Sequence, residues 1–169
     1  MKTDPITSKE EIWSYLEGVI DPEIPVLNVV EMGIVRNVEI EDDQVIVKIT
    51  PTYSGCPAMN AIELEIKKKL REKGIESFRV VTDFKESWTT DWMTDHAKNK
   101  LREYGIAPPE KTEPDDNFLT SLKETQKIVP CPYCNSLETN LRSEFGSTAC
   151  KSLYYCNECH QPFEHFKCI

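Results

Sequence analysis

Two pairs of cysteines give this sequence its clearest chemistry. Cys131-Pro-Tyr-Cys134 and Cys156-Asn-Glu-Cys159 each place two thiols three positions apart. Four thiolates on two such knuckles can surround one metal ion as a tetrahedron, and the spacing is close to that of a zinc ribbon. Four sulfur ligands leave no open coordination position, so we expect a structural Zn²⁺ rather than a catalytic one. The expected metal ligands are Cys131, Cys134, Cys156 and Cys159.

Other uses of this cysteine-rich region are open at the level of sequence. Thiolate sites also accept iron, so a rubredoxin-like electron carrier is an alternative. Such carriers favour a glycine after the second cysteine of each knuckle, and neither knuckle has one. Cys150 and Cys168 could be buried small residues, a redox pair or additional ligands. His160 could replace a ligand, although four cysteines already suffice.

A seventh cysteine, Cys56, stands apart from the others at the expected start of a helix. Pro57 follows it, and proline is favoured at the first helical position, which puts Cys56 at or beside the N-cap. Unpaired backbone N–H groups and the positive end of the helix dipole favour a thiolate there. A thiolate can bind a metal or attack an electrophile, whereas the alternative is a small buried apolar residue.

Three polar residues could work with this thiol. Asp21, Glu23 and Thr50 precede Cys56 in segments that flank the expected strands. Carboxylates near a thiol could take part in catalysis or metal binding, although Asp-Pro pairs also initiate turns, and capping of a turn is the alternative for Asp21. No histidine occurs before His96, so a Cys–His nucleophile is poorly supported.

The pattern of apolar residues predicts the elements that position these groups. Ser8 with Glu11 fits a capping box at the start of a helix. Alternation then predicts a β-hairpin, helical spacing after Cys56 predicts a helix that ends at Gly74, and a third strand and a last helix follow. The predicted ranges are helix 8–18, strands 34–40 and 45–49 around a turn at 41–43, helix 57–74, strand 77–82 and helix 95–104. The expected inward faces are Ile12, Leu16 and Val19; Ile34, Val38 and Ile40; Val45, Val47 and Ile49; Met59, Ile62, Ile66 and Leu70; and Ala97, Leu101 and Tyr104.

These elements indicate an α/β (α+β) fold. We expect a small mixed three-stranded sheet covered by helices on one side, followed by a small zinc-ribbon domain. The domain ranges are 1–107 and 131–169, joined by an acidic, proline-rich linker over 108–130 in which 118–127 could form a short helix. So short a ribbon cannot build a sufficient apolar core, so the metal would supply much of its folding energy.

The overall composition limits the classes of partner. The chain has 20 Lys+Arg against 29 Asp+Glu, which gives a net charge of −9. An acidic chain without a basic run argues against a nucleic-acid surface or an anionic membrane as the main partner. We find no signal peptide and no apolar run long enough to span a membrane, so we expect a cytoplasmic protein.

Three motifs resemble a known family of small α/β proteins. They are DPEIP at 21–25, EMGIV at 31–35 and TPTYSGCP at 50–57. Together they are similar to iron–sulfur maturation factors, which include the bacterial SufT-like proteins and the eukaryotic cytosolic iron–sulfur targeting adaptors. That family usually has Asp-Leu-Gly where this chain has Glu31-Met32-Gly33, a change that keeps an acid and an apolar residue.

Further motifs narrow the resemblance. SWTTDWM at 87–93, GIAPP at 105–109 and SEFGSTACK at 143–151 look like the PaaD type (also lettered PaaJ), which is encoded with ring-1,2-phenylacetyl-CoA epoxidase. The resemblance covers nearly the whole chain. It implies a non-catalytic accessory protein of phenylacetate degradation that helps to assemble or insert an iron–sulfur or iron cofactor in the oxygenase or the iron–sulfur reductase of the epoxidase.

The same resemblance implies roles for individual residues. Cys56 would transiently hold iron or a cluster, or contact the client, while Asp21, Glu23 and Thr50 would flank it and the ribbon would dock on the client. Two alternatives are a scaffold subunit of the epoxidase without catalytic function and a rubredoxin-like electron carrier. A homodimer is also left open.

Overall fold

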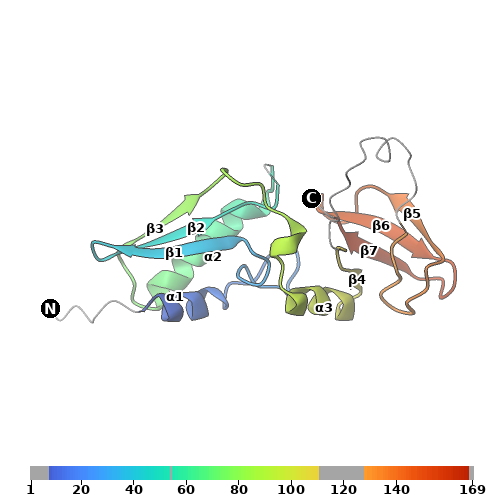
Figure 1. Cartoon of the computed structure of the whole chain (residues 1–169), viewed down its shortest axis with the longest axis horizontal. Helices are drawn as coiled ribbons and strands as arrows, with labels where there is room; N and C mark the ends of the chain where they lie inside the picture. Colours follow the sequence, from blue (N-terminus) through green and yellow to red (C-terminus); the bar gives the residue numbers. More distant parts are fainter. Residues whose placement is uncertain (1–7, 54, 111–127, 168–169) are drawn as a thin grey trace. The chain divides into compact units, whose positions relative to one another are not determined.

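A computed structural model describes residues 8–53, 55–110 and 128–167 of the chain. Contacts between residues divide the chain into two compact units, Met1–Ala97 and Lys98–Ile169. The boundary falls inside helix α3 (Asp95–Glu103). Each unit has its own sheet (Figure 1).

The first unit is built on a three-stranded mixed sheet in the order β1-β2-β3. Strands β1 (Val35–Glu41) and β2 (Gln44–Ile49) form the predicted antiparallel hairpin. Asp42 and Asp43 turn it with φ of 45° and 62°, the left-handed backbone that a two-residue hairpin turn needs and that aspartate tolerates. Strand β3 (Phe78–Thr82) runs parallel to β2, and helix α2 (Ala58–Glu72) makes the connection between them.

Two helices cover this sheet. Helix α1 (Lys9–Leu16) begins with the predicted capping box, in which Ser8 and Glu11 bond to each other's backbone N–H groups. It contacts β1 and α2, and α2 contacts β3, so the helices lie side by side against the sheet (Figure 1). Gly74 ends α2 with φ of 78°, and Ile75 N–H donates to the Leu70 carbonyl oxygen, as expected for a helix-terminating glycine.

The buried faces of α2 and β1 differ from the predicted ones. The buried stripe of α2 starts at Ala58 and continues through Ile62, Ile66 and Leu70, whereas Met59 is half-buried because it lies beside this stripe. A register shift between Val35 and Asn37 turns the chain of β1, so Val35 and Val38 are both buried while Ile40 is only partly covered. Neither a helix start nor a bulge is marked by the apolar pattern alone.

The segment after β3 carries a short 3₁₀-helix, η1 (Thr90–Trp92), and then α3. Thr94 caps α3 as predicted, since its Oγ1 accepts a hydrogen bond from Ala97 N–H. Ala97 and Leu101 are buried, but Tyr104 is 53% exposed, so its predicted place on the apolar face is wrong. The helix ends at Glu103 and Gly105 follows with φ of 88°, which takes Tyr104 off the helix face.

The second unit contains the ribbon. Its four-stranded sheet has the order β4-β7-β6-β5, with β4 (Ile106–Ala107), β5 (Thr139–Ser143), β6 (Lys151–Cys156) and β7 (Pro162–Phe166). Strands β5, β6 and β7 are antiparallel neighbours, whereas β4 is parallel to β7. The sheet is closed over a buried cluster of Ala107, Val129, Cys131, Tyr154, Cys156 and Phe163.

Strand β4 is an element that the sequence did not predict. Two residues are too few to show alternation, and a proline-rich segment follows them. In the structure, Ile106 and Ala107 pair with β7 and so belong to the ribbon's sheet. The division into 1–107, 108–130 and 131–169 stays a proposal, although β4 at the end of the first range pairs with the ribbon. The predicted helix at 118–127 lies outside the described residues.

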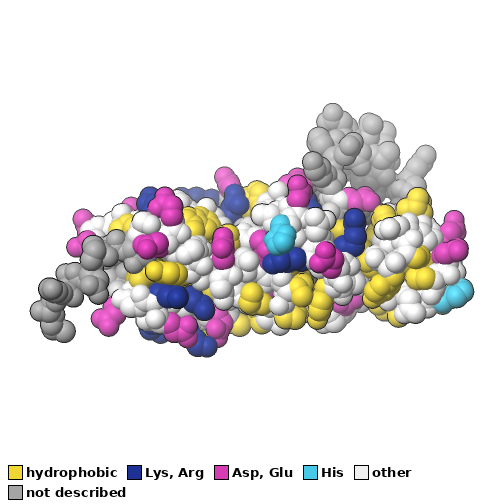
Figure 2. Space-filling view, turned by 90° about the horizontal axis from the view of Figure 1, so that it is seen from below, with side chains coloured by type: hydrophobic (Ala, Val, Ile, Leu, Met, Phe, Trp, Pro, Cys, Tyr) yellow, Lys and Arg dark blue, Asp and Glu magenta, His cyan; other side chains and the backbone are white. Residues whose placement is uncertain are grey.

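The surface is that of a charged protein. Figure 2 shows Asp and Glu side chains interspersed with Lys and Arg over the face that it presents. Among the helices of the described segments, none has the length and apolar content that a membrane span requires.

Candidate functional site

The four knuckle cysteines meet in the second unit. The sulfur atoms of Cys131, Cys134, Cys156 and Cys159 all lie within 4.8 Å of one another. The first knuckle precedes β5 and the second joins β6 to β7, so two neighbouring turns supply two thiols each. This donor set fits Zn²⁺, which takes four thiolates as a closed tetrahedron in structural sites.

The backbone of each knuckle explains why glycine is common at its end. Asn135 and His160, which follow the second cysteines, both have φ of 59°. The chain reverses there, since Asn135 N–H donates to the Cys131 carbonyl and Cys131 N–H to the Ser136 carbonyl. Asparagine and histidine adopt this left-handed conformation more readily than most non-glycine residues. The two knuckles therefore form without glycine.

Electrostatics in the cluster favour a cation. Burial raises the pKa of Cys156, but N–H groups of Cys159 and Glu158 donate to its sulfur and lower the pKa to about 7. Burial and the neighbouring thiols raise the pKa of Cys159 to about 12, although Gln161 N–H donates to that sulfur. One thiol thus ionises near neutral pH and opposes ionisation of the next, a repulsion that a bound cation removes.

Cys56 lies at the entrance to α2. Pro57 occupies the N-cap with φ of −68° and ψ of −23°, so the first helical residue is Ala58 rather than Pro57. Cys56 is therefore one residue outside the cap, which agrees with its predicted place beside it. The side chain is half-buried. Its N–H donates to the Tyr53 carbonyl and its own carbonyl accepts from Met59 N–H.

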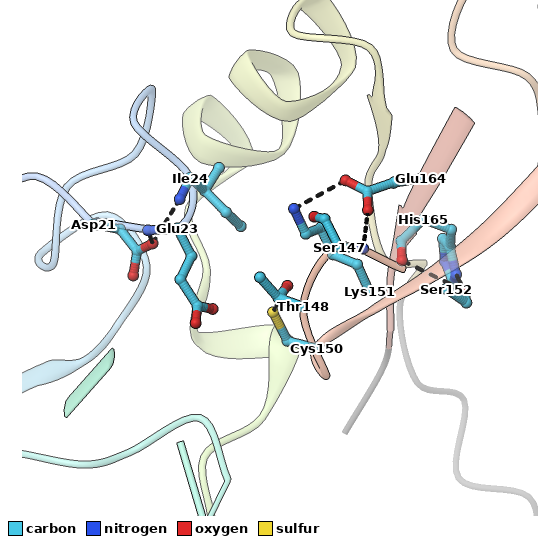
Figure 3. A network of polar contacts seen from close by, with 10 residues as sticks. All are labelled: Asp21, Glu23, Ile24, Ser147, Thr148, Cys150, Lys151, Ser152, Glu164 and His165. Carbon is cyan, nitrogen blue, oxygen red and sulfur yellow. Dashed lines mark hydrogen bonds and ion pairs between the residues drawn. The ribbon is translucent and has the colours of Figure 1, made fainter. Parts of the chain in front are cut away.

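Asp21 has the structural role that was the alternative from the sequence. Its Oδ1 accepts hydrogen bonds from Glu23 N–H at 2.8 Å and Ile24 N–H at 2.7 Å (Figure 3). Asp21 is 5% exposed, and Glu23 is half-buried. The carboxylate thus holds the turn of the DPEIP motif in place.

Backbone hydrogen bonds connect this turn to Thr50. Val29 N–H donates to the Val19 carbonyl, the Val29 carbonyl accepts from Ile34 N–H, and the Ile34 carbonyl accepts from Thr50 N–H at 2.8 Å. The segments on either side of the acidic turn and the start of the cysteine loop are therefore held by one network. The hydrogen bonds of the Cys56 backbone are local, so its closeness to Asp21, Glu23 and Thr50 stays a prediction.

The EMGIV motif packs against the tryptophan motif. Gly33 has φ of 71°, and a Cβ built on it would lie 2.7 Å from both the Cβ and the carbonyl oxygen of Trp92. Trp88 Nε1 donates to the Met32 carbonyl at 3.0 Å. The Arg36 guanidinium lies 3.5 Å from the Trp92 ring centroid. The glycine is needed for this close approach, which the sequence pattern did not reveal.

An ion pair between a buried lysine and a half-buried glutamate organises the ribbon loop before β6, and sequence reasoning missed it. Lys151 is 4% exposed, and its Nζ lies 2.9 Å from Glu164 Oε2. Glu164 Oε1 accepts from Ser147 N–H, and Thr148 Oγ1 lies 3.1 Å from the sulfur of buried Cys150 (Figure 3). Burial raises the pKa of Glu164, but the Ser147 and Lys151 hydrogen bonds outweigh it and hold the pKa below its usual value.

Comparison with protein families matches both units. Residues 9–82 match the family model described as iron–sulfur cluster assembly protein. Residues 115–167 match the model described as PaaD zinc beta ribbon domain.

Sequence relatives cover the chain almost completely. A protein of Escherichia coli (strain K12), provisionally named as one of the subunits of 1,2-phenylacetyl-CoA epoxidase, is 44% identical over 94% of this chain and 92% of its own. An Fe-S protein maturation auxiliary factor of Porphyromonas gingivalis is 33% identical over 60% of this chain and 97% of its own.

Solved structures resemble the first unit. A domain of unknown function from Bacillus anthracis superposes with a TM-score of 0.52 and 27% identity, covering 55% of this chain and 90% of that one. A conserved hypothetical protein from Thermotoga maritima gives 0.51 and 28%, covering 59% of this chain and 98% of that one.

Proposed function

Because the chain belongs to the PaaD family of 1,2-phenylacetyl-CoA epoxidase subunits, we propose that it is an accessory maturation factor for such an epoxidase. It assists the assembly or insertion of an iron–sulfur or iron cofactor in the oxygenase or reductase component and catalyses no reaction of its own. Relatives named as Fe-S protein maturation auxiliary factors support this role. Its place of action is the cytoplasm.

One observation carries the proposal. Cys56 is half-buried directly before the cap of α2, inside the unit that matches the iron–sulfur cluster assembly family. A half-buried thiol is accessible to a cluster or a client yet sheltered from bulk solvent. Cys56 transiently holds the iron or the cluster through its sulfur.

The flanking residues shape the loop around this thiol. Asp21 uses one carboxylate oxygen to hold its turn, which makes it a positioning residue. Thr50 is 4% exposed and begins the loop that carries Cys56. Glu23 is half-buried in the same turn as Asp21, and in this proposal it flanks the cysteine loop.

The ribbon has a separate task. Its four cysteines hold a structural Zn²⁺ and give the unit a stable shape with which it docks on the epoxidase. The net charge of −9 disfavours nucleic acid and anionic membranes as partners. A second copy of the chain is a further candidate partner, and the mass of the purified protein in solution tests this.

A scaffold role is the second candidate, favoured because the E. coli relative is named as part of the epoxidase itself. A scaffold co-purifies with the working epoxidase in fixed proportion, and a reconstituted complex without it loses turnover although its cofactors are complete. A maturation factor is dispensable once the cofactors are in place.

The test is to produce the epoxidase components with this chain or with its Cys56→Ser variant. Iron and acid-labile sulfide in the components and turnover by the complex are then measured. We expect both to fall in the variant. Cys150→Ser serves as the matched control, because it removes a thiol outside the proposed site and outside the four metal ligands. Complete cofactor loading with Cys56→Ser would exclude the proposed role of this thiol.

A further inference from the structure

The four ribbon thiols differ in their exposure to solvent. Cys131 and Cys156 have no exposed surface and belong to the apolar cluster of the second unit. Cys159 is half-buried, whereas Cys134 is exposed. A small reagent in water therefore reaches Cys134 before it reaches the other three ligands.

Each of the four sulfur atoms has a sulfur of the other knuckle close to it. Cys134 Sγ lies 3.6 Å from Cys156 Sγ, and Cys131 Sγ lies 3.7 Å from Cys159 Sγ. Both of these pairs join one knuckle to the other, in a cluster whose four sulfurs all lie within 4.8 Å of one another. A disulfide between Cys134 and Cys156 requires the two sulfurs to approach by only about 1.5 Å, to the usual bond length of about 2.05 Å.

These two observations combine in a known pattern of thiol oxidation. Susceptibility follows thiolate character and exposure, and oxidation becomes a disulfide when a second thiol lies next to the oxidised one. A metal-bound cysteine is a thiolate, so the exposed ligand is a nucleophile with a neighbour that can resolve it.

We propose that Cys134 is a site of oxidation by hydroperoxides, and that Cys156 resolves it so that the ribbon releases its metal as a Cys134–Cys156 disulfide. The Cys134 thiolate attacks hydrogen peroxide, which breaks the O–O bond and gives the sulfenic acid and hydroxide. The Cys156 thiolate then attacks that sulfur and displaces a second hydroxide. Two sulfurs lose one electron each to the peroxide, and the metal keeps only two ligands.

Metal release changes the fold of the unit. Cys131 and Cys156 pack with Ala107, Tyr154 and Phe163, so loss of the ion loosens the core of the sheet. A thiol reductant and added metal reverse the reaction, because a disulfide lies on the reversible part of the oxidation pathway. The proposal stands on the ribbon alone and does not depend on the client of the first unit.

The experiment uses the full chain loaded with Zn²⁺ and treated with hydrogen peroxide. A chromophoric chelator records released Zn²⁺, a dimedone-type reagent traps sulfenic acid, and peptide mapping locates the modified cysteines. We expect trapping at Cys134 before any other ligand, release of Zn²⁺ in step with the Cys134–Cys156 disulfide, and recovery with dithiothreitol and Zn²⁺. Cys150, which is 5% exposed, is the internal control and should stay unmodified while the metal is bound.

Two variants sharpen the test. Cys134→His keeps four ligands, as in structural sites with three cysteines and one histidine. It should slow peroxide-driven Zn²⁺ release about tenfold or more because the most accessible thiolate is gone, whereas Cys159→His should slow it much less. If Cys134→His binds no metal, peptide mapping of the oxidised cysteines in the unaltered protein still tests the proposal. First trapping at another ligand, a disulfide within one knuckle, or Zn²⁺ retained after Cys134 is oxidised would overturn the proposal.

Discussion

A Cβ on Gly33 would lie 2.7 Å from the Cβ of Trp92, closer than real Cβ contacts come. The glycine also has φ of 71°. The contact joins the turn before β1 to η1, and the Trp88 Nε1 hydrogen bond to the Met32 carbonyl secures the same junction. The packing of η1 against the turn before β1 therefore requires a residue without a side chain at position 33.

The first prediction concerns this junction. Gly33→Ala should lower the free energy of unfolding of the first unit by about 2 kcal/mol or more, through left-handed strain together with a clash against backbone. Gly74→Ala is the matched control, since Gly74 has φ of 78° and nothing within 4 Å of the added Cβ. Urea unfolding measures both. Equal losses would mean that the contact with Trp92 adds nothing to the strain.

The second prediction concerns the pair of buried Lys151 and half-buried Glu164. The pKa of Glu164 is lower in the folded state, so its contribution to stability is present above its unfolded pKa of about 4.3 and is lost as the pH falls through the folded pKa. Glu164→Gln should cost about 2 kcal/mol at neutral pH, because it leaves a buried ammonium unpaired.

The pH dependence provides a second readout for the same pair. The difference in stability between the unaltered chain and Glu164→Gln should shrink below about pH 4 and be constant above about pH 6, as followed by thermal unfolding of metal-loaded samples. Glu65→Gln in the other unit is the control, because its pair with Lys68 is exposed and should contribute little. A difference that is constant with pH would show that the Glu164 charge is not involved.

The third prediction concerns the metal. The purified chain should be colourless and contain zinc, and a strong chelator should unfold the second unit while the first keeps its structure, since metal binding supplies folding free energy. Metal analysis, the visible spectrum and NMR spectra with and without chelator check this. Visible bands from iron–thiolate charge transfer would favour the electron-carrier alternative.

The fourth prediction concerns Thr90. Its side chain is fully buried, and its Oγ1 has no hydrogen-bond partner within the described parts of the chain. Thr90→Val replaces this hydroxyl, which lacks a hydrogen-bond partner, with a methyl group of nearly equal volume. It should stabilise the first unit by about 1 kcal/mol. Thr94→Val, which removes the cap of α3, should instead cost about 1 kcal/mol. Thermal unfolding distinguishes the two, and destabilisation by Thr90→Val would mean that the hydroxyl has a partner.

Much of the fold was predictable because its signals are local. The capping box at Ser8, the hairpin turn at Asp42 and Asp43, the cap at Thr94 and the glycines that end helices act over a few residues. The meeting of the four ribbon cysteines was predictable because their spacing reflects one geometric demand, a tetrahedron of thiolates.

The parts that could not be predicted depend on contacts between distant residues. Strand β4 exists because Ile106 and Ala107 pair with β7, which lies far along the chain. The pair of Lys151 and Glu164, and the need for Gly33 opposite Trp92, likewise depend on what the fold brings together. Cys56 was placed correctly beside the helix start, but a sequence gives no distance from it to Asp21.

The parallel pairing of β4 with β7 has a consequence for synthesis of the chain. The first unit can complete its sheet as soon as β3 has left the ribosome, but β4 must wait for the last strand of the ribbon before it finds its neighbour. Until then Ile106 and Ala107 expose apolar side chains and unpaired backbone groups. If the chain were cut after Ala107, the fragment that contains the ribbon would have an uncovered β7 edge and be prone to aggregate. The sheet of the second unit is thus completed late, when its first strand, β4, pairs with its last strand, β7.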